Sequence, residues 1–291
     1  FGSSGSNHFE GYLDEFRISN KCRYNTNFTA PTTAFSNDAN TLLLIHSDTS
    51  NGSTTFTDSS GAAVNTSGST TSYVAANPTY GQSIVSYTGN GSGSASIGHG
   101  LSSAPEMIII KNRELNSDWI VYHSAIGNTK HLRMNLTNAE ITSGTRWSNT
   151  TPTSSVFTLG SDSSVNENND KCIAYCFHSV TGYSKFGTYS GTGSTGNAIT
   201  TGFKPAFVLT KRTNGTEDWF MFDNTRNPTN PVTLRLKPNT NDVESSWDYV
   251  NFTDTGFTWL ATGTGQNGSG DTYVYMAFAD KREYAYWLDQ S

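Results

Sequence analysis

Short runs of alternating or continuous apolar residues recur along most of the chain, and each is bounded by glycine, proline, asparagine or serine. Residues 105–111 (PEMIIIK) and 205–211 (PAFVLTK) are two such runs, and a hairpin-type loop leads from each to a further run that begins with Asp-Trp. Strand-length runs with turn signals at short intervals are typical of β-sandwiches and barrels. The pattern predicts an all-β fold of tandem β-sandwich or jelly-roll-like domains with little or no helix.

Two stretches of about a hundred residues match one another along their length, which is the signature of a duplicated structural unit. The offset is 100 residues through the middle of the units, 102 near their start and 101 near their end. The matched residues are Pro105 and Pro205, Lys111 and Lys211, Asp118 and Asp218, Trp119 and Trp219, Trp147 and Trp247, Phe157 and Phe257, Tyr87 and Tyr189, and Ile97 and Ile199.

In the closing strand of each copy, one set of alternate residues, here called a parity, is apolar in both copies, whereas the other set differs between the copies. The apolar parity holds Ile173, Tyr175 and Phe177 in the first copy and Val274, Met276 and Phe278 in the second. The other parity holds Cys172, Ala174, Cys176 and His178 in the first copy and Tyr273, Tyr275, Ala277 and Ala279 in the second. Because alternate strand residues share a face, we expect the shared apolar parity to face the core and the changing parity to face outward.

These patterns divide the chain into four segments. Residues 1–46 form a piece of different texture, and residues 47–82 are expected to be a linker or extended connector, because much of the stretch is rich in serine, threonine, alanine and asparagine without periodicity. Residues 83–183 and 184–291 are expected to be the first and second β-sandwich repeats. The sequence starts without methionine, so we expect it to be part of a longer chain.

Composition narrows the choice of partners. The net charge is −6 with 14% charged residues, and the sequence pI is about 5.5. Binding to nucleic acid or to an anionic membrane surface usually requires a cationic face, and this composition does not predict one. No run of 18 apolar residues predicts a membrane-spanning helix. Aromatic residues make up 12% of the chain, which supplies the apolar area for a core.

Candidate chemistry is sparse. Cys172, Cys176 and His178 share one parity of a predicted strand, which allows a zinc site, but the second copy does not keep these residue types. Nucleophile elbows, metalloprotease helices and phosphate-binding loops before a helix are not found, and adjacent Asp14 and Glu15 would point to opposite faces of a strand. We therefore expect no enzyme activity, no catalytic residue and no obligatory cofactor.

The aromatic residues leave two interpretations open. The repeated pairs Asp118-Trp119 and Asp218-Trp219, and the matched Trp147 and Trp247, suit structural roles as turn-capping carboxylates and packing indoles, although a tryptophan beside a carboxylate can also bind a sugar. A second group is expected on the surface, where it could line a seam between chains or bind glycans. That group comprises Tyr273, Tyr275, Tyr284, Tyr286 and Trp287.

Residues 9–46 contain a distinctive string of motifs: G-Y-L-D-E-F-R-I-S at 11–19, then R-Y, N-F-T-x-P-T and N-T-L-L-L-I-H. This string resembles the closing part of laminin-G-like, concanavalin-A-like jelly-roll modules in tail-fibre and virion proteins of marine, cyanophage-like bacterial viruses. Residues 41–61 resemble the opening of a further module of this kind. The tandem repeat also resembles the distal domains attached to such fibres.

The resemblance implies a virion or extracellular location, a homo-oligomer such as a trimer, contacts with other virion proteins, and attachment to a glycan or protein of the host surface. It also implies that Asp48 and Asp58 are candidate calcium ligands, against the simpler role of turn capping. The function expected is therefore a structural and adhesive fibre subunit. The alternative is a carbohydrate-binding or carbohydrate-cleaving module of a secreted bacterial protein.

Overall fold

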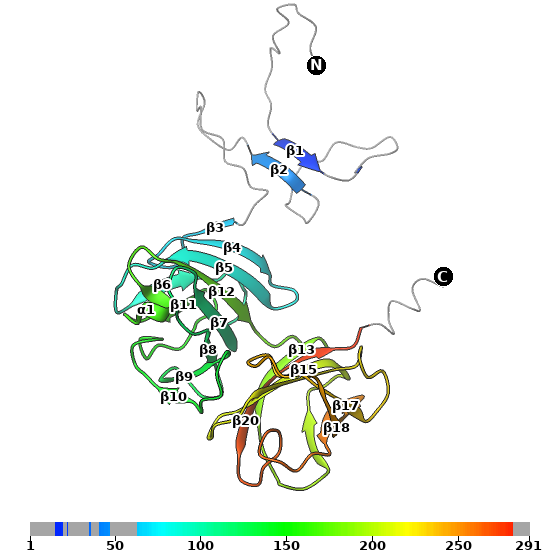
Figure 1. Ribbon diagram of the computed structural model, residues 1–291. Coiled ribbons are helices and arrows are strands. Elements are labelled where there is room, and N and C mark those ends of the chain that lie inside the picture. The colour runs from blue at the N-terminus through cyan, green and yellow to red at the C-terminus, as the bar shows by residue number, and fades with distance from the viewer. Residues whose placement is uncertain (1–14, 20–21, 23–34, 36–40, 47–62, 282–291) are drawn as a thin grey trace, which may run out of the picture. The chain divides into compact units, whose positions relative to one another are not determined.

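The computed structural model describes residues 15–19, 22, 35, 41–46 and 63–281 (Figure 1). It divides into a first unit of residues 1–63 and a second unit of residues 64–291. Strands joined by turns and irregular loops make up the described chain, and its only helix is the single turn α1 (Ser163–Asn166). The expected all-β class with little helix is confirmed.

The described part of the first unit is an antiparallel pair of strands. β1 (Glu15–Ser19) pairs with β2 (Thr41–His46), so that Phe16 lies opposite Ile45. Leu44 on β2 is buried. The E-F-R-I-S end of the motif string and the T-L-L-L-I-H run are therefore partners in one sheet.

The first repeat is built on a large antiparallel sheet with the strand order β10-β9-β8-β7-β12-β5-β4-β3, and a two-stranded sheet of β11 and β6 lies against it. Its strands are β3 (Ala63–Asn65), β4 (Ser72–Asn77), β5 (Gln82–Thr88), β6 (Ala95–Gly98), β7 (Met107–Asn112), β8 (Ile120–His123), β9 (Lys130–Arg133), β10 (Ile141–Thr142), β11 (Val156–Leu159) and β12 (Lys171–Phe177).

Residues 63–77 correct the expected domain boundaries. We expected 47–82 to be a connector, but β3 and β4 lie in this range and belong to the sheet of the first repeat. β4 pairs with β5 along its whole length, from Ser72 opposite Tyr87 to Asn77 opposite Gln82. The polar composition of this stretch did not indicate a strand. β4 forms because its backbone pairs with β5, and side-chain composition alone does not reveal such pairing.

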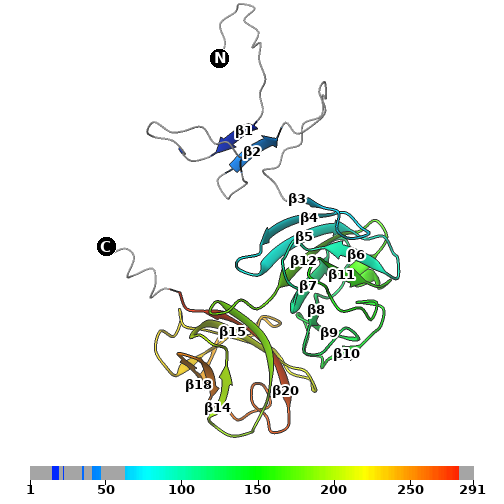
Figure 2. The same cartoon turned by 180° about the vertical axis from the view of Figure 1, so that it is seen from behind.

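The second repeat is a sandwich of two four-stranded antiparallel sheets, β13-β20-β15-β16 and β14-β19-β18-β17 (Figure 2). Its strands are β13 (Ser184–Ser190), β14 (Asn197–Thr200), β15 (Pro205–Arg212), β16 (Trp219–Asp223), β17 (Val232–Arg235), β18 (Ser245–Thr253), β19 (Gly256–Trp259) and β20 (Thr272–Ala279).

The two repeats share their strand order and register. β5-β12-β7-β8 corresponds to β13-β20-β15-β16, and β6-β11 corresponds to β14-β19. Tyr87 pairs with Cys172 in the first copy, and the matched Tyr189 pairs with Tyr273 in the second. The copies differ at β18, which forms a central strand in the second repeat, whereas residues 143–150 of the first repeat form turns.

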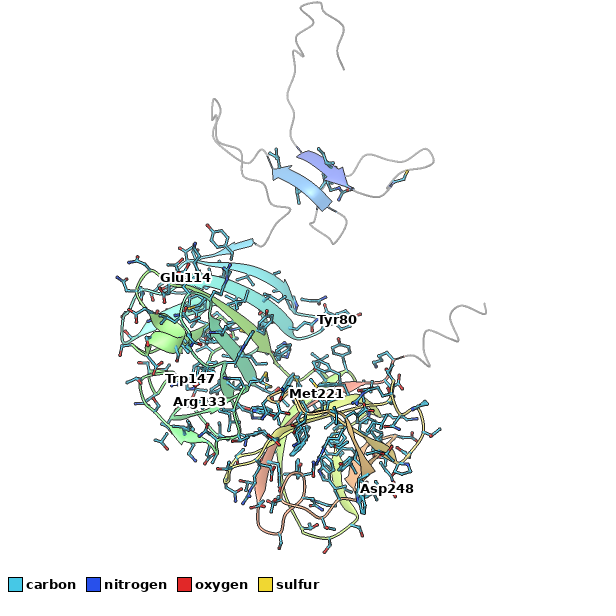
Figure 3. The ribbon with its side chains drawn as sticks, in the orientation of Figure 1. Tyr80, Glu114, Arg133, Trp147, Met221 and Asp248 are labelled. Atoms are coloured by element: carbon cyan, nitrogen blue, oxygen red, sulfur yellow. The ribbon has the colours of Figure 1, made fainter. Side chains whose placement is uncertain are left out.

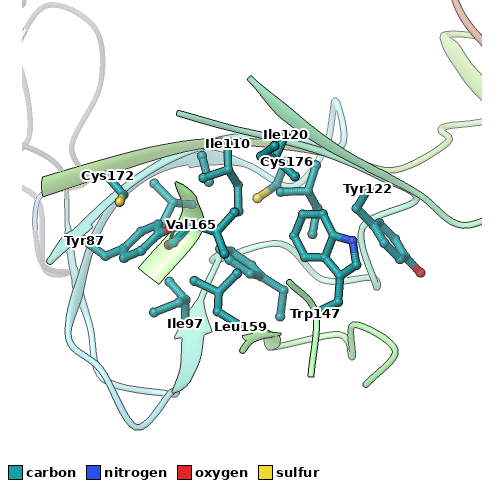
Figure 4. Close-up of a cluster of buried hydrophobic side chains, with 14 of the residues drawn as sticks. Tyr87, Ile97, Ile110, Ile120, Tyr122, Trp147, Leu159, Val165, Cys172 and Cys176 are labelled. Atoms are coloured by element: carbon teal, nitrogen blue, oxygen red, sulfur yellow. Dashed lines mark hydrogen bonds between the residues drawn. The ribbon is translucent and has the colours of Figure 1, made fainter. Parts of the chain in front are cut away.

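Each repeat has its own buried core between its two sheets. In the first repeat, Figure 4 shows Cys172 and Cys176 on β12 reaching into the same cluster as Tyr87 and Val165, with Trp147 and Tyr122 at its far end. The second repeat has a core that is richer in aromatic rings, including stacked Tyr189 and Tyr273 with centroids 4.8 Å apart. Burial of these apolar faces is the main stabilising contribution to each sandwich.

Candidate functional site

The changing parity of the closing strands faces the sandwich cores, which reverses our expectation. Cys172 and Cys176 have no exposed surface, and Tyr273 and Tyr275 are 0% and 4% exposed. The shared apolar parity lies on the opposite face of each sheet, where it packs one repeat against the other. Both faces of these central strands are buried, so alternation alone could not identify the inner face.

The interface between the repeats is a third apolar cluster, formed by equivalent sheet faces. Ile109 and Val121 of the first repeat and Leu209 and Val274 of the second are 0–8% exposed within it. Met221 packs against the same cluster and lies at the junction of the two sandwiches in Figure 3. Because matched positions such as 109 and 209 meet in one cluster, each repeat presents the same kind of surface to the other, as in a two-fold symmetric dimer.

The shared apolar parity is therefore explained by pairing of the repeats. Phe177 stacks on Phe186 of the second repeat, with ring centroids 5.7 Å apart and planes at 25°, and it also meets Phe278 edge-on at 6.5 Å. Aromatic pairs of this geometry add to the free energy of burial. A side chain that must be apolar for the same contact in both copies is retained in both.

Polar contacts fasten the edge of this interface. The indole Nε1 of Trp219 donates to the carbonyl of Arg133, and the backbone amide of Glu217 donates to the carbonyl of Thr137. Lys211 is fully buried, and its Nζ donates to the carbonyl of Thr137 at 3.3 Å and to that of Arg212 at 2.7 Å. Burial lowers the pKa of the Lys211 ammonium to about 8.

The repeated Asp-Trp pair forms one local structure in both copies. In the first, the amide oxygen of Asn135 accepts from the backbone amide of Trp119, while its amide nitrogen donates to Asp118. In the second, Asn239 makes the same two bonds, to Trp219 and to Asp218. The pair is a backbone clasp between neighbouring strands, which agrees with the expected structural role.

The matched Trp147 and Trp247 do not share a role. Trp147 is 1% exposed and meets Tyr122 edge-on at 5.5 Å, whereas Trp247 is 69% exposed. The equivalent of Tyr122 is Phe222, and it meets Trp259 edge-on at 5.4 Å. The packing indole thus comes from β19 in the second repeat, which leaves the tryptophan on β18 outside the core and corrects the expectation that Trp247 is a packing residue.

Two buried asparagines, which the sequence analysis did not single out, organise the glycine-rich turns. Asn166 donates through its amide nitrogen to the carbonyls of Gly160 and Ser92, and Asn267 donates to those of Ala261 and Ser194. The amide oxygen of Asn166 also accepts a backbone amide of the turn after β5, and that of Asn267 accepts one of the turn after β13. The 101-residue offset between these asparagines was the signal that could have identified them.

Of the five aromatic residues expected on the surface, the structure describes two, and both are internal. Tyr273 is locked by its hydroxyl, which donates to the carbonyl of Thr264 at 2.6 Å and accepts from the amide of Gly268 at 2.8 Å. Burial raises the pKa of Tyr273 and of Tyr275 to about 12. Their expected exposure is wrong, because their strand is covered on both faces. Tyr284, Tyr286 and Trp287 lie outside the described residues.

The zinc hypothesis gains no support. Cys172 and Cys176 point into the core, where burial raises their pKa to about 11 and about 12 and so disfavours the thiolate that binds zinc. His178 bonds through Nδ1 to the carbonyl of Ser179. Within the described ranges, no group of three or more His, Cys, Asp or Glu side chains could hold a metal ion. The calcium candidates Asp48 and Asp58 lie outside those ranges.

A polar pocket of about 460 Å³ opens among the loops of the second repeat. Polar and charged groups from separate segments of the chain converge there. Its lining comprises Lys204, Asn224, Asn227, Pro228, Thr229, Asn230, Val232, Phe252 and Asp280. The amide nitrogen of Asn224 donates to Asp280 at 2.5 Å, while Asn230 bonds twice to the backbone of Phe252. The loop before Val232 is two residues longer than its counterpart in the first repeat.

In the part of the chain that the structure describes, no helix is long and apolar enough to cross a membrane. The helix α1 is a single turn. Comparison with known proteins finds no curated protein and no solved structure that matches this chain. A family model described as a domain of unknown function, DUF7483, matches residues 18–282. That match covers most of the chain, including the strands of both repeats, and the chain belongs to the DUF7483 family.

Proposed function

We propose that this chain is a structural and adhesive module of a virion fibre of a bacterial virus. The observation that carries the proposal is the way the duplicated sandwich is fastened: two equivalent sheet faces close on one another and bury their shared apolar residues. Such an arrangement suits a scaffold that must hold its shape outside a cell. The motif resemblance of residues 9–46 supplies the virion context.

The placement of the ionisable groups supports a scaffold rather than a reaction centre. His123 and His131 are 1% exposed, and burial lowers the pKa of each to about 4, which keeps the rings neutral. Arg146 pairs with Asp162 at 2.8 Å, and Arg212 pairs with Asp271 at 2.6 Å. These two arginine–carboxylate pairs connect separate segments of the fold.

Assembly and adhesion together test the proposal. The purified chain is expected to sediment as a multimer at micromolar concentration and to bind the surface of host bacteria without changing soluble glycans. A chain that remains monomeric and binds no cell would contradict the fibre assignment. The multimer measurement comes first because it requires no knowledge of the host.

The loop pocket of the second repeat favours a second candidate, a carbohydrate-binding module. Its volume lies within the range of roughly 300–1,000 Å³ that is usual for small-ligand sites. The ammonium of Lys204, the carboxylate of Asp280 and the hydroxyl of Thr229 offer the donors and acceptors that sugar hydroxyl groups need.

A glycan array separates this candidate from the first. Binding that Lys204→Ala and Thr229→Ala abolish would assign the pocket to a sugar, and release of reducing ends would extend the assignment to cleavage. No binding at millimolar glycan would leave the fibre proposal alone. Val243→Ala is the matched control, because Val243 is exposed and does not line the pocket.

A further inference from the structure

One row of apolar side chains crosses the large sheet of the first repeat and is only partly covered. Cross-strand pairing places Ala75 beside Ile84, Ile84 beside Tyr175, Tyr175 beside Ile109, and Ile109 beside Val121. Because paired residues project from the same face, these side chains form one continuous strip. Its Val121 end is buried against the second repeat, whereas Ile84 is 48% exposed.

Two tyrosines extend the uncovered end of this strip. Tyr73 on β4 is 53% exposed and lies on the same face, opposite Ser86 of β5. Tyr80, in the turn between β4 and β5, is 47% exposed, and its ring lies 4.9 Å from that of Tyr183, which in turn meets Phe278 at 5.9 Å. The uncovered surface, which we term the β4–β5 face (Tyr73, Ala75, Tyr80 and Ile84), is therefore continuous with the interface between the repeats.

The duplication shows what the fold does with this position when it is covered. Ile84 on β5 corresponds to Phe186 on β13, at the 102-residue offset. Phe186 is 3% exposed because Phe177 of the first repeat stacks on it. The same sheet position is thus an interface residue in one copy and half-exposed in the other.

The charge pattern indicates what kind of surface covers the β4–β5 face. From Ser59 to Pro105 the sequence contains no Asp, Glu, Lys or Arg, and this stretch includes β4, β5 and the short edge strand β3. Exposed sheet edges are normally protected by charged side chains, and the centres of protein interfaces are depleted of them. An uncharged apolar face cannot form ion pairs with a charged partner, but it can pack against a second apolar face of the same kind.

We propose that the β4–β5 face is the surface through which a second copy of this chain binds, so that the apolar packing between the repeats continues between molecules. The pairing is self-complementary, because each copy presents Tyr73 and Ile84 to the other. The inference deepens the proposed function by identifying which face assembles, and it rests on that function only in requiring that the chain form multimers.

Sedimentation equilibrium of the full chain and of single variants tests this inference. Ile84→Lys and Tyr73→Lys each place a charge in the proposed interface, and each is expected to raise the dissociation constant of the multimer at least about 100-fold, since burying like charges opposite one another costs several kcal/mol. Val243→Lys is the control, because Val243 is 90% exposed, lies just before β18 of the second repeat and is not part of this face. It is expected to assemble as the wild type does.

A second measurement separates assembly from misfolding. Hydrogen exchange of residues 72–88 is expected to slow as the wild-type concentration rises through the dissociation constant, while near-ultraviolet circular dichroism of the variants stays unchanged. A wild-type multimer that both Lys variants leave intact would refute the β4–β5 face and spare the fibre proposal. A wild type that is monomeric at about 100 μM would refute this inference and count against the fibre proposal as well.

Discussion

The indole nitrogen of Trp219 donates a 2.8 Å hydrogen bond to the backbone carbonyl of Arg133, which belongs to the other repeat. The matched Trp119 instead stacks on Tyr175 of its own repeat, with ring centroids 6.4 Å apart and planes at 29°. One duplicated Asp-Trp pair therefore has a common backbone role in both copies and an additional role in joining them only in the second.

Replacing Trp219 tests how much this joint contributes. Trp219 is 1% exposed, so Trp219→Ala is expected to lower the free energy of unfolding by about 3–5 kcal/mol through lost burial and the cavity left behind. Trp247→Ala removes the same side chain at a site that is 69% exposed and is expected to change stability by less than about 0.5 kcal/mol. Urea unfolding followed by circular dichroism measures both, and equal losses would contradict the assigned roles.

The buried asparagines are expected to be sensitive positions. Asn267→Ala leaves the carbonyl of Ala261 without its donor and removes one of the two donors to the carbonyl of Ser194. It is expected to cost at least about 2 kcal/mol, because unpaired buried polar groups retain their full desolvation penalty. Asn166→Ala is expected to do the same in the first repeat.

The control for the asparagine variants is Asn128→Ala, which removes a side-chain bond to Thr151 that is exposed. It is expected to change the free energy of unfolding by less than about 0.5 kcal/mol. Should Asn128→Ala prove as damaging as Asn267→Ala, the central role given to the buried asparagines would be lost.

Acid is expected to destabilise the chain through its buried histidines. Burial lowers the native pKa of His123 and His131 from 6.5 to about 4, so the unfolded chain binds protons first as the pH falls. The contribution of these histidines to the free energy of unfolding is therefore constant above about pH 7.5. Between pH 6.5 and 4 it declines by roughly 3 kcal/mol for each histidine.

The variant His123→Asn tests the assignment of this pH dependence. Its amide oxygen can replace Nδ1 as the acceptor for the backbone amide of Ala125, while the side chain no longer titrates. Urea midpoints measured from pH 7.5 to 4.5 are expected to fall less steeply than in the wild type. An unchanged slope would show that His123 does not contribute.

The cysteines are expected to differ in reactivity. Cys22 is exposed, whereas Cys172 and Cys176 are buried and their pKa is raised to about 11 and about 12. A thiol-specific disulfide reagent is expected to label Cys22 alone in the folded chain at pH 8 and all three cysteines in denaturant. Rapid labelling of Cys172 or Cys176 before unfolding would show that the first core opens.

The structure also shows how far the sequence pattern could be interpreted. The strand pairs Tyr87–Cys172 and Tyr189–Tyr273 occupy equivalent places in the two copies, as the alignment of the copies requires, because a duplicated sheet keeps its register. The inner face of β12 did not follow, because apolar side chains occupy both of its faces. The difference in burial between the matched Trp147 and Trp247 likewise did not follow from the sequence, because only packing decides it.

By itself the sequence determined the β class, the duplication and a structural role for the repeated Asp-Trp pair, since period-2 alternation, turn residues and repeated motifs are local properties. Tertiary structure alone decided that the second repeat covers the first, that Tyr273 and Tyr275 are internal, and that Ile84 remains half-exposed where Phe186 is buried. Burial depends on which surfaces meet across large separations in sequence, and no local pattern contains that information.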